Sequence, residues 1–119
     1  MWYQAGDIIR VRVHGVIFHE GIITEHGRVI SNSRRRGGVF EESLRVFSGG
    51  KKIQNLGALA GFDPQVAVNR ARSQIGQPYD LVAYNCQHFV RWCYGLKPKS
   101  HQKRVAFGAA ALLGVLWFI

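Results

Sequence analysis

The sequence contains few cysteines and few acidic residues. Its 119 residues include two cysteines, one methionine and three prolines. Because Cys86 and Cys93 cannot build a disulfide framework, we expect a reducing compartment. Seven Asp and Glu stand against sixteen Lys and Arg, which gives a formal net charge of +9. The surface is therefore expected to attract an anionic partner, and phospholipid, nucleic acid and an acidic protein all remain open at this point.

A long hydrophobic run is lacking until residues 105–119 (VAFGAAALLGVLWFI). The opening MWYQAGDIIR has no basic leader and no apolar run, so we predict no secretory signal. Four cations lie in residues 97–104 (KPKSHQKR), directly before the apolar tail. A helix that starts at Ser100 would reach about 30 Å, the thickness of the hydrocarbon core. We predict a catalytic domain at 1–96, a basic linker at 97–104 and a membrane anchor at 105–119, with the catalytic domain facing the cytoplasm. The alternative is an apolar helix that docks on the domain or mediates oligomerisation.

Short alternating runs fill residues 7–31. In residues 7–13 (DIIRVRV), apolar side chains alternate with arginines, which is typical of a strand with one solvated face. Residues 16–18, 21–24 and 28–31 add β-branched and aromatic runs separated by turn signals, so an antiparallel meander is predicted. Residues 31–52 are rich in Gly, Ser and Arg and indicate a mobile loop, interrupted by short strands or turns near 39–40 and 44–47.

Two helices are predicted after the strands. Asp63 and Pro64 form an N-cap followed by proline at the first helical position, and Gly76 is the expected stop. The spacing places three apolar residues on one face: Ala67, Ala71 and Ile75. Strands followed by helices favour an α+β fold in which an antiparallel sheet packs with helices, with the C-terminal hydrophobic helix added.

The second helix should run from about Cys86 to near Gly95. Its predicted buried face holds Cys86, Phe89, Val90 and Cys93. A cysteine in the first turn of a helix lies at the positive end of the helix dipole, which favours the thiolate. The same backbone amides can receive an oxyanion when the thiolate attacks a carbonyl. The competing interpretation is a buried structural cysteine, and we assign Cys93 to the core on this ground.

A cysteine nucleophile needs a base, and five histidines are available: His14, His19, His26, His88 and His101. His19 is the strongest candidate, because it opens a predicted strand and a rigid strand can hold a base against a helix N-terminus. His88 is two residues beyond Cys86, so we expect it to orient a loop or cap a backbone group. The others lie at turns or in the basic linker.

Other sites are disfavoured. The spacings of Cys and His do not match a zinc site, so we predict no metal, and no cofactor is expected. GGKK at residues 49–52 lacks the P-loop spacing. The cations form no single stripe, so nucleic-acid binding is disfavoured. Arg34, Arg35 and Arg36 indicate either a solvated loop tip or a contact with a phosphate or lipid headgroup.

Residues 75–95 (IGQPYDLVAYNCQHFVRWCYG) resemble the cysteine box of the lecithin retinol acyltransferase-like family, a branch of the NlpC-like, permuted papain-type thiol hydrolases. GDIIRVRV, FHEGIIT and GRVIS are similar to its earlier strands and histidine box. The resemblance covers roughly residues 5–96. It implies a permuted papain-like α+β fold, a thiol nucleophile at Cys86 and a general base at His19.

The third position, which orients the base and is often a second histidine in that family, falls on Ser31, with Asn32 as the alternative. Serine can hydrogen-bond but cannot carry charge. Gln87 replaces a common Glu, which should favour the thiolate. Tyr84, Asn85 and Gln87 are expected to support the nucleophile or the oxyanion.

The resemblance implies a membrane-associated phospholipase or acyltransferase that acts on glycerophospholipids through an acyl thioester on Cys86. The expected partners are a phospholipid membrane and its lipids. Two alternatives stay open. One is a cysteine peptidase or amidase of the same superfamily, and the other is a catalytically weak membrane adaptor that keeps the fold.

Overall fold

The computed structural model describes residues 2–81 and 85–96. The predicted linker, the predicted apolar anchor and Tyr84 lie outside the described residues. In the part of the chain that is described, no helix combines the length and the apolar character needed to cross a bilayer.

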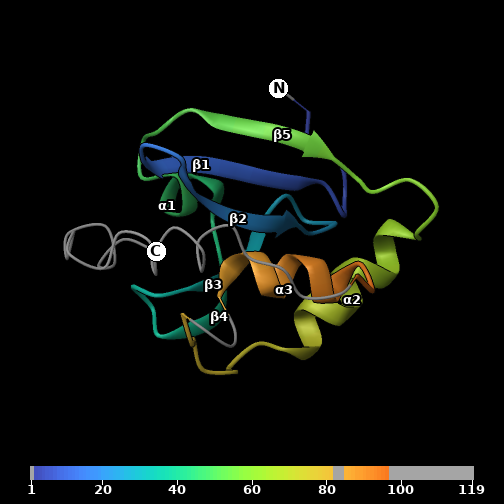
Figure 1. Ribbon diagram of the computed structural model, residues 1–119. Coiled ribbons are helices and arrows are strands. Elements are labelled where there is room, and N and C mark those ends of the chain that lie inside the picture. The colour runs from blue at the N-terminus through green and yellow to red at the C-terminus, as the bar shows by residue number, and fades with distance from the viewer. Residues whose placement is uncertain (1, 82–84, 97–119) are drawn as a thin grey trace.

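Five antiparallel strands form one sheet in the order β4-β3-β2-β1-β5 (Figure 1). The bounds are β1 Ile8–His14, β2 Ile17–Ile23, β3 Val29–Ser33, β4 Gly38–Glu42 and β5 Ile53–Gly57. β1 to β4 follow one another along the sheet, as the predicted meander requires. β5 then returns to the free side of β1, so the first strand lies inside the sheet rather than at its edge.

Three helices complete the described fold: α1 Leu44–Ser48, α2 Pro64–Ser73 and α3 Cys86–Cys93. Helices α2 and α3 pack together on one side of the sheet (Figure 1). Their apolar faces meet Ile22 of β2 and Ile30 of β3 in one buried cluster. The neighbouring residues Ile23 and Val29 belong to a second cluster with Phe47 of α1. The period-2 alternation of β2 and β3 therefore divides the core between two faces of the sheet.

The predicted α+β class is confirmed, and so are both predicted helices. Asp63 caps α2 by accepting a hydrogen bond from Gln65 N at 2.9 Å, with Pro64 as the first helical residue. Four residues on the predicted inner face of α3 are buried: Cys86, Phe89, Val90 and Cys93. The local signals of cap, proline and apolar spacing were sufficient here, because they agree with the packing.

Three local predictions were wrong. Residues 44–48 form a helix rather than a strand or turn, because Ser43 Oγ accepts from Val46 N at 3.1 Å and Gly49 ends the turn in the left-handed region. Ser31 and its neighbours form buried β3 instead of opening a loop. Ile75 lies beyond the end of α2 and is 45% exposed, so it does not extend the inner face. Strand β5 was missed, since the three central residues of IQNLG are all exposed and the segment shows no alternation.

The turn before β1 ties the N-terminal and C-terminal parts of the domain together. Gly6 N donates to Ile23 O at 2.8 Å, and the Tyr94 hydroxyl donates to Gly6 O. Gly6 has φ +87°, and a Cβ placed there would lie 2.4 Å from Pro64 Cβ. Both the backbone conformation and the close approach to α2 therefore require glycine.

We expect Gly6→Ala to lower the free energy of unfolding by about 3 kcal/mol, the sum of a left-handed alanine and an overpacked contact. Gly27→Ala is the matched control, because Gly27 has φ +72° but nothing within 4 Å of an added Cβ. It should cost only the conformational part, about 1–2 kcal/mol. Urea unfolding measures both, and equal losses would show that the contact with Pro64 contributes nothing.

Candidate active site

β2 and β3 separate at the end where β2 begins. Their ladder pairs Ile22 with Ile30 and Ile23 with Val29. Within the described residues, the first five positions of β2 have no ladder partner in β3. Ile23 bonds to the β1 side, since its N–H donates to Asp7 O at 2.9 Å. Backbone groups alternate along a strand, so the Phe18 carbonyl points toward β3, into the opening.

The N-terminus of α3 occupies this opening. Cys86 Sγ donates to Phe18 O at 3.8 Å, and Asn32 Nδ2 of β3 donates to Asn85 O at 3.5 Å. Contacts of one helix end with both strands place Cys86 between β2 and β3, directly beside the backbone of the residue before His19. The Cys86 side chain is 0% exposed. The predicted nucleophile and the strand of its predicted base are therefore together.

A capping box fixes the helix that carries Cys86. Asn85 Oδ1 accepts from Gln87 N at 3.0 Å and from His88 N at 3.1 Å, while Asn85 N donates to His88 Nδ1 at 3.1 Å. The capping role expected of His88 is confirmed. Two of the amides that the sequence suggested for an oxyanion, those of Gln87 and His88, are thus engaged by the cap.

His19 lies on the Phe47 face of the sheet. Its ring stacks on Phe47 with centroids 4.8 Å apart and planes 26° apart. Burial, together with the positive charge of Arg35, lowers the pKa of His19 from 6.5 to about 4. The imidazole is therefore neutral at pH 7 and can accept a proton.

The two candidates for the third position lie on opposite faces of β3. Alternation places Ser31 with Val29, on the same face as His19, and Asn32 with Ile30, on the α3 face. Both side chains are buried, at 1% and 0% exposure. Asn32 contacts the cap of α3, as described above. Asn32 therefore lies where it can position the helix of Cys86, whereas Ser31 lies on the face where it could orient His19.

Tyr79 is a further candidate residue of the site, and the sequence analysis did not identify it. Burial raises the pKa of its phenol, and the negative charge of a Cys86 thiolate contributes to the rise. The phenol therefore stays protonated in electrostatic range of the thiol. Tyr79 N donates to Gly37 O at 3.0 Å, which fixes its segment alongside β4. No local signal in the sequence could have revealed this, because the contact joins distant segments.

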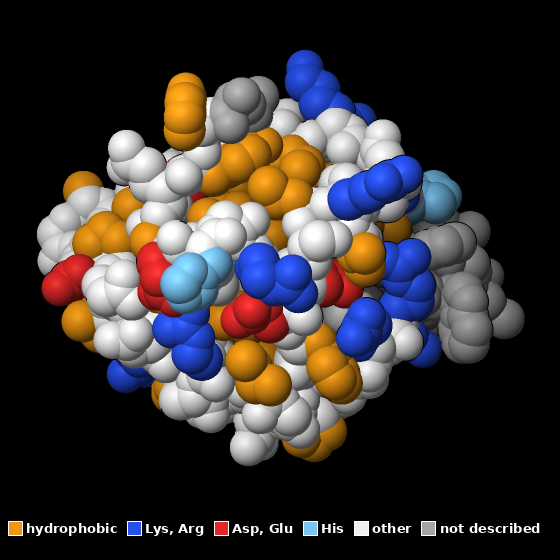
Figure 2. Space-filling view, turned by 180° about the vertical axis from the view of Figure 1, so that it is seen from behind, with side chains coloured by type: hydrophobic (Ala, Val, Ile, Leu, Met, Phe, Trp, Pro, Cys, Tyr) orange, Lys and Arg blue, Asp and Glu red, His pale blue; other side chains and the backbone are white. Residues whose placement is uncertain are grey.

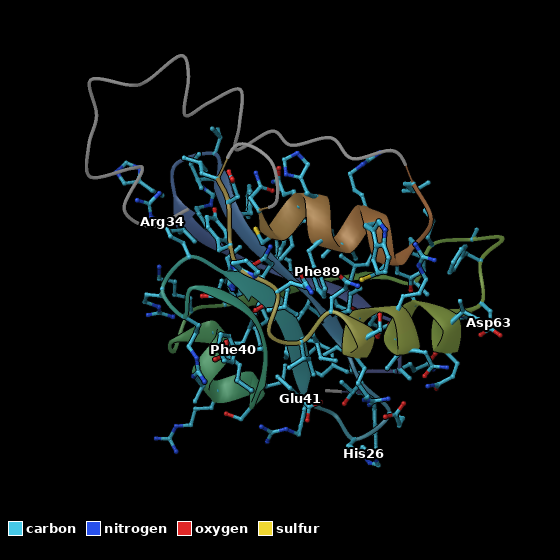
Figure 3. All side chains as sticks on the ribbon, turned by 90° about the horizontal axis from the view of Figure 1, so that it is seen from below. His26, Arg34, Phe40, Glu41, Asp63 and Phe89 are labelled. Atoms are coloured by element: carbon cyan, nitrogen blue, oxygen red, sulfur yellow. The ribbon has the colours of Figure 1, made fainter. Side chains whose placement is uncertain are left out.

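The arginine triplet is divided by the fold. Arg36 folds back onto β4, where it lies 3.4 Å from a Glu42 carboxylate oxygen and 4.9 Å from the Phe40 ring centroid. Arg34 and Arg35 instead line a pocket of about 310 Å³ that also includes His19. Arg34 lies at the end of the molecule where α3 begins, far from Asp63 (Figure 3).

Cys93 is buried in the core cluster that α2 and α3 share. Burial raises the pKa of Cys93 to about 12, so this thiol stays protonated in the core. No group of three His, Cys, Asp or Glu side chains in the described ranges is arranged to hold a metal ion.

Comparison with family models matches residues 3–98 to the model described as lecithin retinol acyltransferase. The chain belongs to the lecithin retinol acyltransferase family. A comparison with curated proteins found no match. Membership in this family supports an acyltransferase or thiol-hydrolase type of chemistry, and the matched range includes both the His19 strand and the Cys86 helix.

The low pKa of His19 predicts an acid-sensitive fold in this member of the lecithin retinol acyltransferase family. Between about pH 6.5 and 4 the unfolded chain binds more protons at this residue than the folded chain does, so stability falls as the pH falls through that window. His19→Gln should remove part of this dependence, which urea unfolding at about pH 7 and about pH 4.5 would measure. His26→Gln is the control, because the His26 side chain is 74% exposed. Equal pH dependence in the wild type and His19→Gln would contradict the assignment.

Proposed function

We propose that this protein is a cysteine-dependent phospholipase or acyltransferase that acts on glycerophospholipids, with Cys86 as nucleophile and His19 as general base. The observation that carries the proposal is the position of Cys86 at the start of α3, inside the opening between β2 and β3 and 3.8 Å from Phe18 O. This contact places the thiol beside the backbone of the residue that precedes His19.

The first step forms a thioester. His19 accepts the proton of the Cys86 thiol as the sulfur attacks the ester carbonyl, and the carbonyl electrons move to oxygen. The tetrahedral intermediate collapses when the carbon–oxygen ester bond breaks. The departing lysophospholipid alkoxide takes the proton from His19, so the acyl group stays on Cys86 and His19 is neutral again.

The second step releases the acyl group. Water, or the amine of an acceptor, loses a proton to His19 as it attacks the thioester carbonyl. The carbon–sulfur bond breaks and the thiolate recovers the proton. Water gives a free fatty acid, and an amine gives an N-acyl product.

The oxyanion needs donors other than the two capped amides. We assign this role to the Tyr79 hydroxyl and the Gln87 carboxamide, with Tyr84 outside the described residues as a further donor. The protonated state of Tyr79, which its raised pKa maintains, supports the assignment.

The lipid substrate also accords with the charge of the chain and its apolar end. The net charge of +9 favours an anionic membrane surface, and residues 105–119 would hold the catalytic domain there, with the linker 97–104 at the headgroups on the cytoplasmic side.

The nucleophile is tested by incubating the full chain with phosphatidylcholine vesicles. Mass spectrometry should find an acyl adduct on the Cys86 peptide. Cys86→Ala should lower fatty-acid release by about a thousandfold or more, since the residual rate lacks covalent catalysis. Cys93→Ala, the same substitution on the same helix, should retain the adduct and most of the rate. Fatty-acid release that persists undiminished in Cys86→Ala would overturn the proposal.

The two faces of β3 separate the roles of Ser31 and Asn32. We expect Ser31→Ala to lower kcat/KM about tenfold and to move the acid limb of its pH profile, because the hydroxyl orients His19. Ser31→Thr keeps a hydroxyl and should restore the wild-type limb. Asn32→Ala should leave the limb in place, since Asn32 contacts the cap of α3. A shifted limb in Asn32→Ala but not in Ser31→Ala would reverse the assignment.

A further inference from the structure

The pocket beside His19 has an apolar floor and a cationic rim. Its volume of about 310 Å³ lies at the lower end of small-molecule sites. Val11 and Phe47 line the floor and are buried. Arg35 and Lys51, from the loops after β3 and after α1, line it as exposed residues. Two segments that are distant in sequence thus bring cations to the rim of one pocket.

Cations, and no carboxylates, are among the described residues that line this pocket. The described lining residues include Arg34, Arg35 and Lys51 but no Asp or Glu. In the described part of the chain, neither Arg35 nor Lys51 forms an ion pair. Figure 2 shows that Asp and Glu side chains lie between Lys and Arg side chains on the back face of the molecule. The pocket rim is therefore a local excess of positive charge, which raises the concentration of anions at its mouth.

We propose that this pocket binds the headgroup phosphate of a glycerophospholipid at Arg35 and Lys51, and that the protein prefers net-anionic headgroups over zwitterionic ones. The inference rests on the proposed function for the identity of the ester. Guanidinium and ammonium groups both bind phosphate. A choline or ethanolamine cation would meet the charges of Arg35 and Lys51, whereas a glycerol headgroup or a bare phosphate would not be repelled.

The same placement directs the ester toward the base. In a glycerophospholipid, the ester carbonyls and the phosphate are attached to one three-carbon glycerol unit. A phosphate held at the rim therefore leaves the ester near the floor, where His19 stacks on Phe47. The apolar floor suits the glycerol carbons and the first methylenes of the acyl chain. Binding of the headgroup phosphate therefore also positions the ester near His19.

The test uses monomeric lipids, because a chain of net charge +9 binds any anionic vesicle. Dihexanoyl phosphatidylglycerol and dihexanoyl phosphatidylcholine are supplied to the full chain below the concentration at which they form micelles. The rate of Cys86 acylation is measured for each lipid. We expect phosphatidylglycerol to be favoured about tenfold, which is the size of one charge-assisted contact.

Arg35→Gln and Lys51→Gln should each reduce this preference to about twofold or less. Both side chains are exposed, so thermal unfolding should be unchanged. Arg45→Gln is the matched control: Arg45 is exposed on α1 and is not among the described residues that line the pocket. It should keep the full preference. An equal loss in Arg45→Gln, or an undiminished preference in both rim variants, would overturn the proposal.

A binding measurement separates this inference from the proposed function. Calorimetric titration of Cys86→Ala with the same two lipids needs no catalysis. Preference for phosphatidylglycerol that disappears in Cys86→Ala/Arg35→Gln supports the rim even if the wild type forms no acyl adduct. Acylation that proceeds equally with both lipids, together with equal binding, would leave the proposed function standing and refute the headgroup selection.

Discussion

The site depends on one insertion: the N-terminus of α3 fills the opening between β2 and β3. An unpaired strand carbonyl in a protein interior is costly, and here the Phe18 carbonyl accepts from the Cys86 thiol instead of from a β3 amide. Asn32, on the other strand, donates to Asn85 O. Part of the β2–β3 ladder is therefore absent, and the helix end that occupies its place carries Cys86, the proposed nucleophile. A continuous β2–β3 ladder would leave Cys86 outside the sheet.

The insertion explains why the capping of α3 is so complete. A helix end inside a protein cannot leave its amides to water, so Asn85 and His88 satisfy them reciprocally. This rigidity holds Cys86 in place, but it also commits the Gln87 and His88 amides that a helix dipole would otherwise offer to an oxyanion. In the proposed mechanism, the Tyr79 and Gln87 side chains donate to the oxyanion, and neither role requires the cap to open.

Sequence reasoning succeeded where a local rule and the packing agree. The cap and proline of α2 and the apolar spacing of α3 were sufficient to place both helices. It failed at β5, an edge strand whose central residues are all exposed, and at α1, a helix of five residues. Both segments are too short or too exposed to show a clear hydrophobic period. Cys86 and His19 could be predicted as nucleophile and base from residue type and motif, and that pair stays a prediction. The opening between two strands could not, since it depends on which backbone groups of β2 are already paired with β1. Tyr79 was missed for the same reason.

The net charge of +9 is not spread evenly over the functional surface. Three arginines of the described chain are partnered by carboxylates: Arg28 with Glu41, Arg36 with Glu42 and Arg72 with Glu25. Each such pair contributes little to stability, but it cancels much of the field that its arginine projects. Arg35 and Lys51, at the rim beside His19, form no ion pair in the described part of the chain. Burial is the main reason for the low pKa of His19, and the charge of Arg35 at this rim acts in the same direction, so the imidazole beside the rim is neutral at pH 7.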